Sequence, residues 1–157
     1  MYKALKKKYY YIVVPAIVIA ILLIIFKQNN ILQVTSTSFV VNTISPVIFI
    51  LTALFAIAFP VLHRTIFNNG IKELKSITTD KFYRYQNQLL YVIAFTPYLV
   101  LIAYVLHLPQ FFFGGTALFS LYALYFYYPS EKRIRNEKLI YRVKEEIYTI
   151  IPDAKGQ

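Results

Sequence analysis

From Tyr85 to Ser130 the chain reads YQNQLLYVIAFTPYLVLIAYVLHLPQFFFGGTALFSLYALYFYYPS and contains no Asp, Glu, Lys or Arg. The hydrocarbon core of a bilayer is about 30 Å thick, so a helix that spans it needs about 20 mainly apolar residues. This stretch is too long for one such helix. It is broken at His107-Leu108-Pro109-Gln110, and the break predicts two antiparallel spans, 89–108 and 111–128.

Two further apolar stretches precede this region. They run over residues 9–26 and 39–62, and neither contains a charged side chain. The whole chain is 58% hydrophobic and 15% charged, whereas a soluble domain is about 45–50% apolar. The sequence therefore predicts an all-α integral membrane protein, with a four-helix transmembrane bundle over residues 1–130.

Lys and Arg are distributed unevenly between the ends of these four spans. Four precede the first span, five lie between the second and the third, and seven follow the fourth, whereas the opposite side carries Lys27 alone. Basic loops remain in the cytoplasm, so both termini are expected to be cytoplasmic, an N-in/C-in topology. The net charge of +10 is thereby explained by topology, and we expect no nucleic-acid partner. The wealth of Ile, Lys and Asn favours a bacterial cytoplasmic (inner) membrane.

The loop between the second and third spans contains signals for a helix end and a helix start. Asn68-Asn69-Gly70 suits the left-handed residue that closes a helix, so the second helix is expected to extend to Phe67. Thr78-Thr79-Asp80 offers an N-cap for a long third helix.

Residues 131–157 are expected to form a cytoplasmic amphipathic helix of about 20 residues that ends before Pro152. Ser130 can cap it. Its candidate contacts with a partner or with lipid are Arg135, Ile140, Val143, Ile147 and Ile150. The favoured interpretation is a helix that lies on anionic lipid or against the loops of its own bundle, and the alternative is docking onto another subunit.

Polar side chains within the spans are the default place to look for function. The candidates are Asn42, Thr43, Ser45, Thr96 and Tyr98. Pro46 cannot donate a backbone hydrogen bond and is expected to bend the second span beside them. Similar breaks are expected at Pro15, Pro60 and Pro97, so that each of the first three spans is bent. Interhelical hydrogen bonding by Asn42 is the favoured interpretation, with a small polar pocket or lateral opening as the alternative.

The residues argue against most enzyme classes. The chain has no Cys, which excludes thiolate metal sites, iron–sulfur clusters and a cysteine nucleophile. His63 and His107 belong to opposite ends of the bundle, roughly 30 Å apart, so they cannot ligate one haem. We expect no catalytic, cofactor-binding or metal-binding residues and no cofactor.

The leading hypothesis is a non-enzymatic accessory or scaffold subunit of a larger inner-membrane complex. It would dock through transmembrane packing and the basic tail, with other membrane protein subunits and anionic lipids as partners. The alternative is a small oligomeric transporter or channel for a small solute or lipid, built on the kinked second and third spans, and a membrane enzyme ranks third. Small residues, Ala16 with Ala20 and Thr116 with Ser120, would let helices approach closely, within the chain or in a homo-oligomer.

Overall fold

The structure is a computed structural model of the chain, and it describes residues 2–28, 38–72, 74 and 76–144. These residues are helical except for short connections and one ladder of two very short strands. In chain order the elements are α1 (Tyr2–Gln28), the π-helical turn η1 (Val40–Ile44), α2 (Ser45–Ala53), the π-helical turn η2 (Leu54–Ala58), α3 (Phe59–Ile71), β1 (Ile77–Thr78), α4 (Thr79–Val105), α5 (Gln110–Phe126), α6 (Glu131–Ile140) and β2 (Val143–Lys144).

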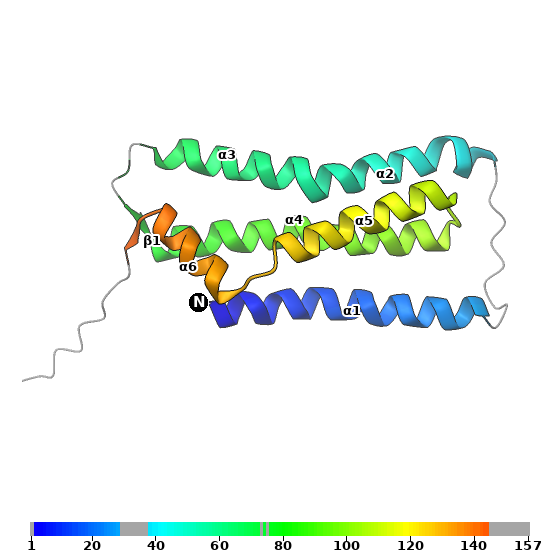
Figure 1. Cartoon of the computed structure of the whole chain (residues 1–157), viewed down its shortest axis with the longest axis horizontal. Coiled ribbons are helices and arrows are strands. Elements are labelled where there is room, and N and C mark those ends of the chain that lie inside the picture. The colour runs from blue at the N-terminus through cyan, green and yellow to red at the C-terminus, as the bar shows by residue number, and fades with distance from the viewer. Residues whose placement is uncertain (1, 29–37, 73, 75, 145–157) are drawn as a thin grey trace, which may run out of the picture.

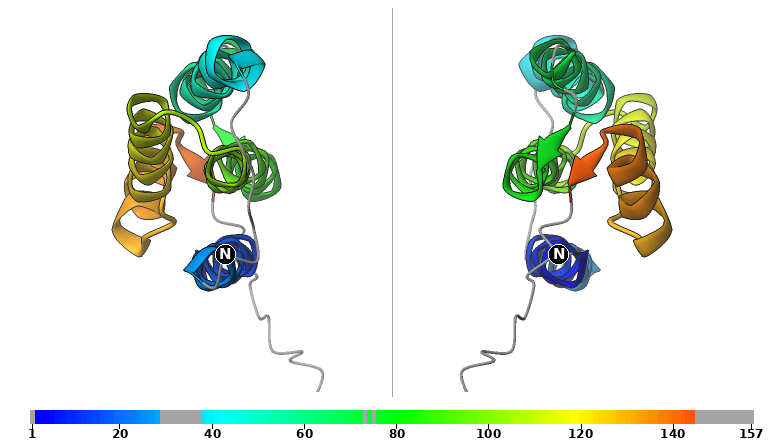
Figure 2. Two further views of the ribbon diagram at one scale, coloured as in Figure 1. Left: turned by 90° about the vertical axis from the view of Figure 1, so that its right-hand side faces the viewer. Right: turned by 90° about the vertical axis from the view of Figure 1, so that its left-hand side faces the viewer.

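Helix α4 lies at the centre of the bundle. It packs against α1, α3, α5 and η2, and the end-on views show α1 on one side of it, with the α2–α3 rod and α5 on the others (Figure 2). Successive long elements run in opposite directions (Figure 1). The start of α1, the end of α3, the start of α4 and the whole of α6 therefore lie at one end of the molecule. We call it the basic end, because the segments that gather there carry most of the Lys and Arg.

Three helical segments are long and apolar enough to cross a membrane, which is consistent with a membrane protein. They are Tyr2–Phe26, Val41–Ile71 and Thr79–Val105, with 25, 31 and 27 residues. These segments contain most of the first, second and third predicted spans, respectively. The fourth predicted span, 111–128, falls on α5, which is apolar but has only 17 residues.

The second of these segments contains two π-helical turns, each followed closely by a proline. η1 ends just before Ser45-Pro46, and η2 ends just before Phe59-Pro60. A proline lacks an N–H and its ring crowds the carbonyl four residues earlier, so the helix must widen or bend nearby. At η2 the N–H of Phe59 indeed bonds to the carbonyl of Leu54, five residues back. The irregularity predicted at Pro46 and Pro60 is present as these turns. Pro15 and Pro97 lie inside α1 and α4, which continue past them as α-helices, so the breaks predicted at these two positions are wrong.

The prediction that Asn68-Asn69-Gly70 ends the second segment is wrong. α3 continues to Ile71 with Gly70 inside it, and no described glycine has a positive φ. Phe67 and Ile71 both pack against the buried cluster at the basic end. Helices in proteins owe most of their stability to such packing, and here it outweighs the tendency of glycine to end a helix.

The two ends of α4 lie close to their predicted positions. Its first residue is Thr79, with Thr78 in the extended cap conformation and Asp80 in the first turn, although the Thr78 side chain makes no capping hydrogen bond. At the other end His107 adopts a left-handed φ of 52°, and the N–H of Leu108 bonds back to the carbonyl of Ala103 at 3.1 Å. The break predicted between the third and fourth spans is confirmed.

The tail helix begins as predicted but is much shorter. The Ser130 hydroxyl accepts a hydrogen bond from the N–H of Arg133 at 3.2 Å, and α6 then ends at Ile140. The chain turns at Tyr141 and at Arg142, which has a φ of 48°, and β2 pairs in parallel with β1. The expected helix of about 20 residues is therefore wrong, because Val143 lies in a strand; Ile147 and Ile150 lie outside the described residues.

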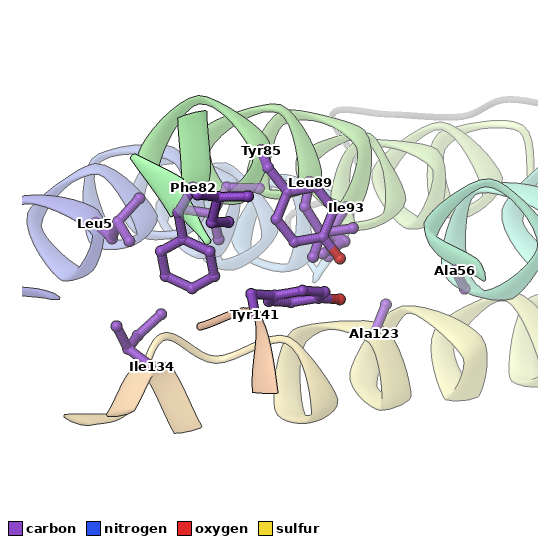
Figure 3. Close-up of a cluster of buried hydrophobic side chains, with 11 residues drawn as sticks. Leu5, Ala56, Phe82, Tyr85, Leu89, Ile93, Ala123, Ile134 and Tyr141 are labelled. Atoms are coloured by element: carbon purple, nitrogen blue, oxygen red, sulfur yellow. The ribbon is translucent and has the colours of Figure 1, made fainter. Parts of the chain in front are cut away.

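The larger of the two buried apolar clusters lies at the basic end. It brings together residues that are far apart in the chain, from Leu5 of α1 and Phe82 and Tyr85 of α4 to Ile134 of α6 and the following Tyr141 (Figure 3). Leu5 and Phe82 are fully buried, and Ile134 is 3% exposed. The short helix α6 is thus packed against the bundle's own helices.

Candidate functional site

The predicted intramembrane polar residues differ in their surroundings. Asn42 and Thr43 lie in η1 with exposed side chains, whereas Ser45 is fully buried at the start of α2. Thr96 is also fully buried, and its hydroxyl donates to the carbonyl of Ile93 in its own helix at 2.9 Å. Tyr98 contacts a different helix. Its hydroxyl donates to the carbonyl of Ile12 in α1 at 3.2 Å.

Buried hydroxyls from three helices make hydrogen bonds inside the bundle. Thr52 of α2 donates to the carbonyl of Ile48 at 2.8 Å, and Thr116 of α5 donates to the carbonyl of Phe112 at 2.8 Å. Ser120 of α5 donates to the Thr96 hydroxyl of α4 at 3.4 Å. A hydroxyl that bonds to its own helix can be buried without an unmet donor, and it leaves a small side chain that lets helices approach. The bond between Ser120 and Thr96 joins α5 to α4, whereas the side chain of Asn42, for which an interhelical bond was predicted, is exposed.

The two histidines lie at opposite ends, as the sequence indicated. The Nδ1 atom of His107 lies 3.0 Å from the carbonyl oxygen of Val105 in the turn after α4. His63, on α3, stacks on the ring of Tyr85 and its Nε2 lies 3.1 Å from the Gln88 side-chain oxygen. Within the described part of the chain, no group of three or more His, Asp or Glu side chains could hold a metal ion.

Tyr141 is the residue that joins the tail to the membrane helices. Its buried ring lies 5.3 Å from that of Phe67, 5.9 Å from that of Phe82 and 5.8 Å from that of Tyr85, between centroids. Phe67 and Tyr85 themselves stack at 4.1 Å. Together with Ile134 these four rings form what we call the end cluster, and Figure 3 shows Tyr141 reaching across to Tyr85 and Phe82. Edge-to-face aromatic pairs add to the stabilisation that area burial provides.

A polar contact reinforces the aromatic one. Glu137 of α6 accepts a hydrogen bond from the side-chain amide of Gln86 on α4 and forms an ion pair with Arg133 at 3.0 Å. Gln86 is 3% exposed. Arg133 also lies over the ring of Tyr127. The charge of Glu137 is therefore matched within α6 while its second oxygen holds α6 onto α4.

The predicted tail contacts divide between surface and interior. Arg135 and Ile140 are exposed on α6, and Val143 is half-buried against the end cluster. Leu139 is 73% exposed and Ile140 62% exposed, which is unusual for neighbouring apolar residues on so polar a helix. Leu139 and Ile140 therefore form an exposed apolar surface at the end of α6.

Sequence reasoning missed the end cluster and the Gln86–Glu137 contact. Gln86 and Glu137 are 51 residues apart in the chain, and no local periodicity relates them. A weak signal existed in Tyr141, an aromatic residue directly beyond a polar helix, because a large ring that follows a helix end is often buried.

A gap remains between α1 and its neighbours α4 and α5. A cavity of about 270 Å³ is lined by small and apolar side chains of α1, α4 and α5, among them Ala16, Ala20, Pro97 and Ser120. α1 is held across this gap by the Tyr98 bond, and nearer the basic end by a hydrogen bond of 2.8 Å from Lys8 to Asn87. Leu5 and Ala16 of α1 are nevertheless buried, so the helix packs against the bundle around this gap.

No protein family, curated protein or solved structure matches this chain.

Proposed function

We propose that this chain is a non-catalytic accessory or scaffold subunit of a larger complex in the bacterial cytoplasmic membrane. The observation that carries the proposal is the exposed apolar pair Leu139 and Ile140 on α6. α6 is fixed to the bundle through Ile134 and Glu137 on its other side. A rigidly held polar helix that presents adjacent apolar side chains provides an anchor for a partner protein.

In this proposal the basic end faces the cytoplasm and α5 crosses the membrane as a fourth span. The bias of sixteen basic residues to one supports this orientation. The 17 residues of α5 extend about 26 Å at 1.5 Å per residue. α5 returns along α4 toward the basic end (Figure 1). The tyrosines that follow it, Tyr127 and Tyr128, suit the headgroup layer.

The outer surface of α1 is a second surface on which such a subunit can dock. Only 11% of its most apolar stretch is buried inside the chain. Tyr11 is 82% exposed, and Ile17 and Ile21 further along the helix are each 53% exposed. Lipid covers such a surface in a monomer, and a neighbouring transmembrane helix covers it in a complex.

The test is affinity purification of the tagged full-length chain from native membranes in mild detergent, followed by quantitative mass spectrometry. We expect a membrane protein to copurify in fixed stoichiometry. The variant Leu139→Gln with Ile140→Gln should lose this partner, while the matched variant Lys132→Gln, which leaves the apolar pair intact, should retain it. Recovery of the wild-type chain without a stoichiometric partner contradicts the proposal.

A second candidate function is a small oligomeric transporter or channel. Two π-helical turns in one membrane segment favour it, since such turns are frequent at functional sites. The exposed Asn42 and Thr43 lie in the first of them. Solute or lipid flux in proteoliposomes that contain only the purified chain would support this function. Flux that is unchanged in Asn42→Ala and Tyr98→Phe would exclude the predicted polar site.

A further inference from the structure

A groove between α3 and α4 lies at the basic end, on the surface of the bundle. Its volume is about 410 Å³. From α3 it is lined by Ile66, Phe67 and Gly70, and from α4 by Lys81, Arg84 and Tyr85, among others. The stacked rings of Phe67 and Tyr85 connect the two helices. The groove thus has apolar and aromatic walls and two cationic side chains.

The cations lie at the outer end of the groove. Lys81 is near the first residue of α4 and Arg84 is one turn further along, so both project from the same face. Tyr85 and Gln88 follow them toward the middle of the bundle. α3 runs in the opposite direction, so Ile66 lies deeper than Gly70. The groove therefore carries its two cations at the end nearer the expected headgroup layer, and its deeper lining, Ile66, Tyr85 and Gln88, is uncharged.

Neither cation is neutralised. Both side chains are exposed, and no acidic side chain among the described residues pairs with either of them. Arg133 on α6 differs from them, because it forms an ion pair with Glu137 and lies over the ring of Tyr127. Two uncompensated cations beside an apolar groove attract an anion that carries a hydrocarbon chain.

Gly70 supplies the space for such a ligand. A methyl group added at its α-carbon would meet no atom within 4 Å. α3 therefore presents bare helix to the groove beside the cations. Gly70 is an unfavourable residue for the last turn of a helix, and an open groove gives its presence there a physical reason.

We propose that this groove binds one anionic phospholipid, with the phosphate at Lys81 and Arg84 and an acyl chain along Ile66, Phe67 and Tyr85. Basic pockets between membrane helices on the cytoplasmic side bind such headgroups. A zwitterionic lipid has the same chains but no net charge to pair with the two cations. The site is independent of whether the chain acts as an accessory subunit or as a transporter.

The test is native mass spectrometry of the purified full-length chain, titrated with phosphatidylglycerol or with phosphatidylcholine of the same acyl chains. We expect one phosphatidylglycerol to bind in preference to phosphatidylcholine. Each cation contributes about fivefold to binding, so Lys81→Gln with Arg84→Gln should weaken phosphatidylglycerol binding roughly 30-fold. The matched variant Lys132→Gln with Arg135→Gln removes the same charge from α6 and should leave binding unchanged.

A second variant separates the groove from general electrostatic attraction. Gly70→Phe fills the groove without changing charge and should also reduce phosphatidylglycerol binding at least tenfold. Circular dichroism confirms that it folds. Equal losses in the α4 and α6 charge variants, full binding by Gly70→Phe, or displacement of the lipid by inorganic phosphate at equal concentration would each overturn the proposal. The last result would indicate an anion site without a lipid.

Discussion

Helix α4 has two kinds of neighbour. On one side α2, α5 and the α6 tail fit closely: the Phe49 ring of α2 lies against the bare helix at Gly115 of α5, and Tyr141 fills the space between α3 and α4. On the other side α1 buries Leu5 at the basic end, and further along it is joined to α4 by hydrogen bonds such as the one to the carbonyl of Ile12. A cavity of about 270 Å³ remains between α1 and its neighbours.

The difference indicates how stability is distributed in the bundle. Close packing of rings and small residues specifies one arrangement of α2 to α6 and resists change in volume. The cavity leaves part of α1 without such close packing, and a hydrogen bond between membrane helices contributes only about 0.6 kcal/mol on average. We therefore expect α1 to be displaced more easily beside the cavity than α5 is. The close-fitting side is expected to define the fold, and the α1 side to accommodate lipid or a partner helix.

The largest effect is expected at the end cluster. Tyr141→Ala removes a buried ring that contacts Phe67, Phe82 and Tyr85, and truncation of a buried aromatic residue costs about 3–5 kcal/mol. α6 should detach, and limited proteolysis should cleave at α6 while α1 to α5 remain protected. Tyr141→Phe keeps the ring and is the control. Protection of α6 in the alanine variant would show that the ring does not hold the tail.

A smaller effect, with opposite signs at adjacent residues, is expected in α5. A Cβ at Gly115 would collide with the Phe49 ring, which is itself surrounded by Phe111, Phe112 and Phe119. Overpacking of this kind costs about 1–3 kcal/mol, so Gly115→Ala should lower the thermal midpoint in detergent.

Gly114 is the matched control for this substitution. A Cβ there meets open space, so Gly114→Ala should raise the midpoint slightly, because alanine is favoured over glycine in a helix by about 1 kcal/mol. Equal midpoints for the two variants would contradict the close approach of α2 and α5.

The smallest effect is expected on the α1 side. Tyr98→Phe removes the hydrogen bond to the carbonyl of Ile12 and should cost about 0.6 kcal/mol. Hydrogen–deuterium exchange should increase in α1 and remain unchanged in α5. An increase of equal size in both helices would show that α1 is as tightly coupled to α4 as α5 is.

Apolar length was enough to predict the helical membrane class. Breaker residues were enough to predict the irregular helix at Pro46 and Pro60 and the turn at His107, although breaks at Pro15 and Pro97 were predicted wrongly. These are local properties, because burial in lipid depends on the composition of each segment alone. Whether Thr96 and Ser120 would meet depended on how two helices rotate about their axes, which composition does not determine.

The errors arose where distant residues decide the local structure. Gly70 lies inside α3 because residues on both sides of it are packed. Phe67 belongs to the end cluster, and Ile71 packs against the same buried core. The tail helix ends at Ile140 because Tyr141 turns into that cluster, and Arg142 adopts a left-handed conformation in the turn. Such a conformation is unfavourable for arginine, and the packing of Tyr141 offsets its cost. The partners Phe67 and Tyr85 could not be identified from the periodicity of the tail.

The most direct test of the account is the side of the membrane on which each end of the bundle lies. The chain has no native cysteine, so single cysteines can be placed at Lys3, Asn69, Gln110 and Arg135 and labelled in intact cells with a membrane-impermeant thiol reagent. The account predicts that only Gln110→Cys reacts in intact cells and that the other three react after the membrane is opened. Reaction of Arg135→Cys in intact cells, or protection of Gln110→Cys alongside Lys3→Cys, would contradict four spans with both termini in the cytoplasm.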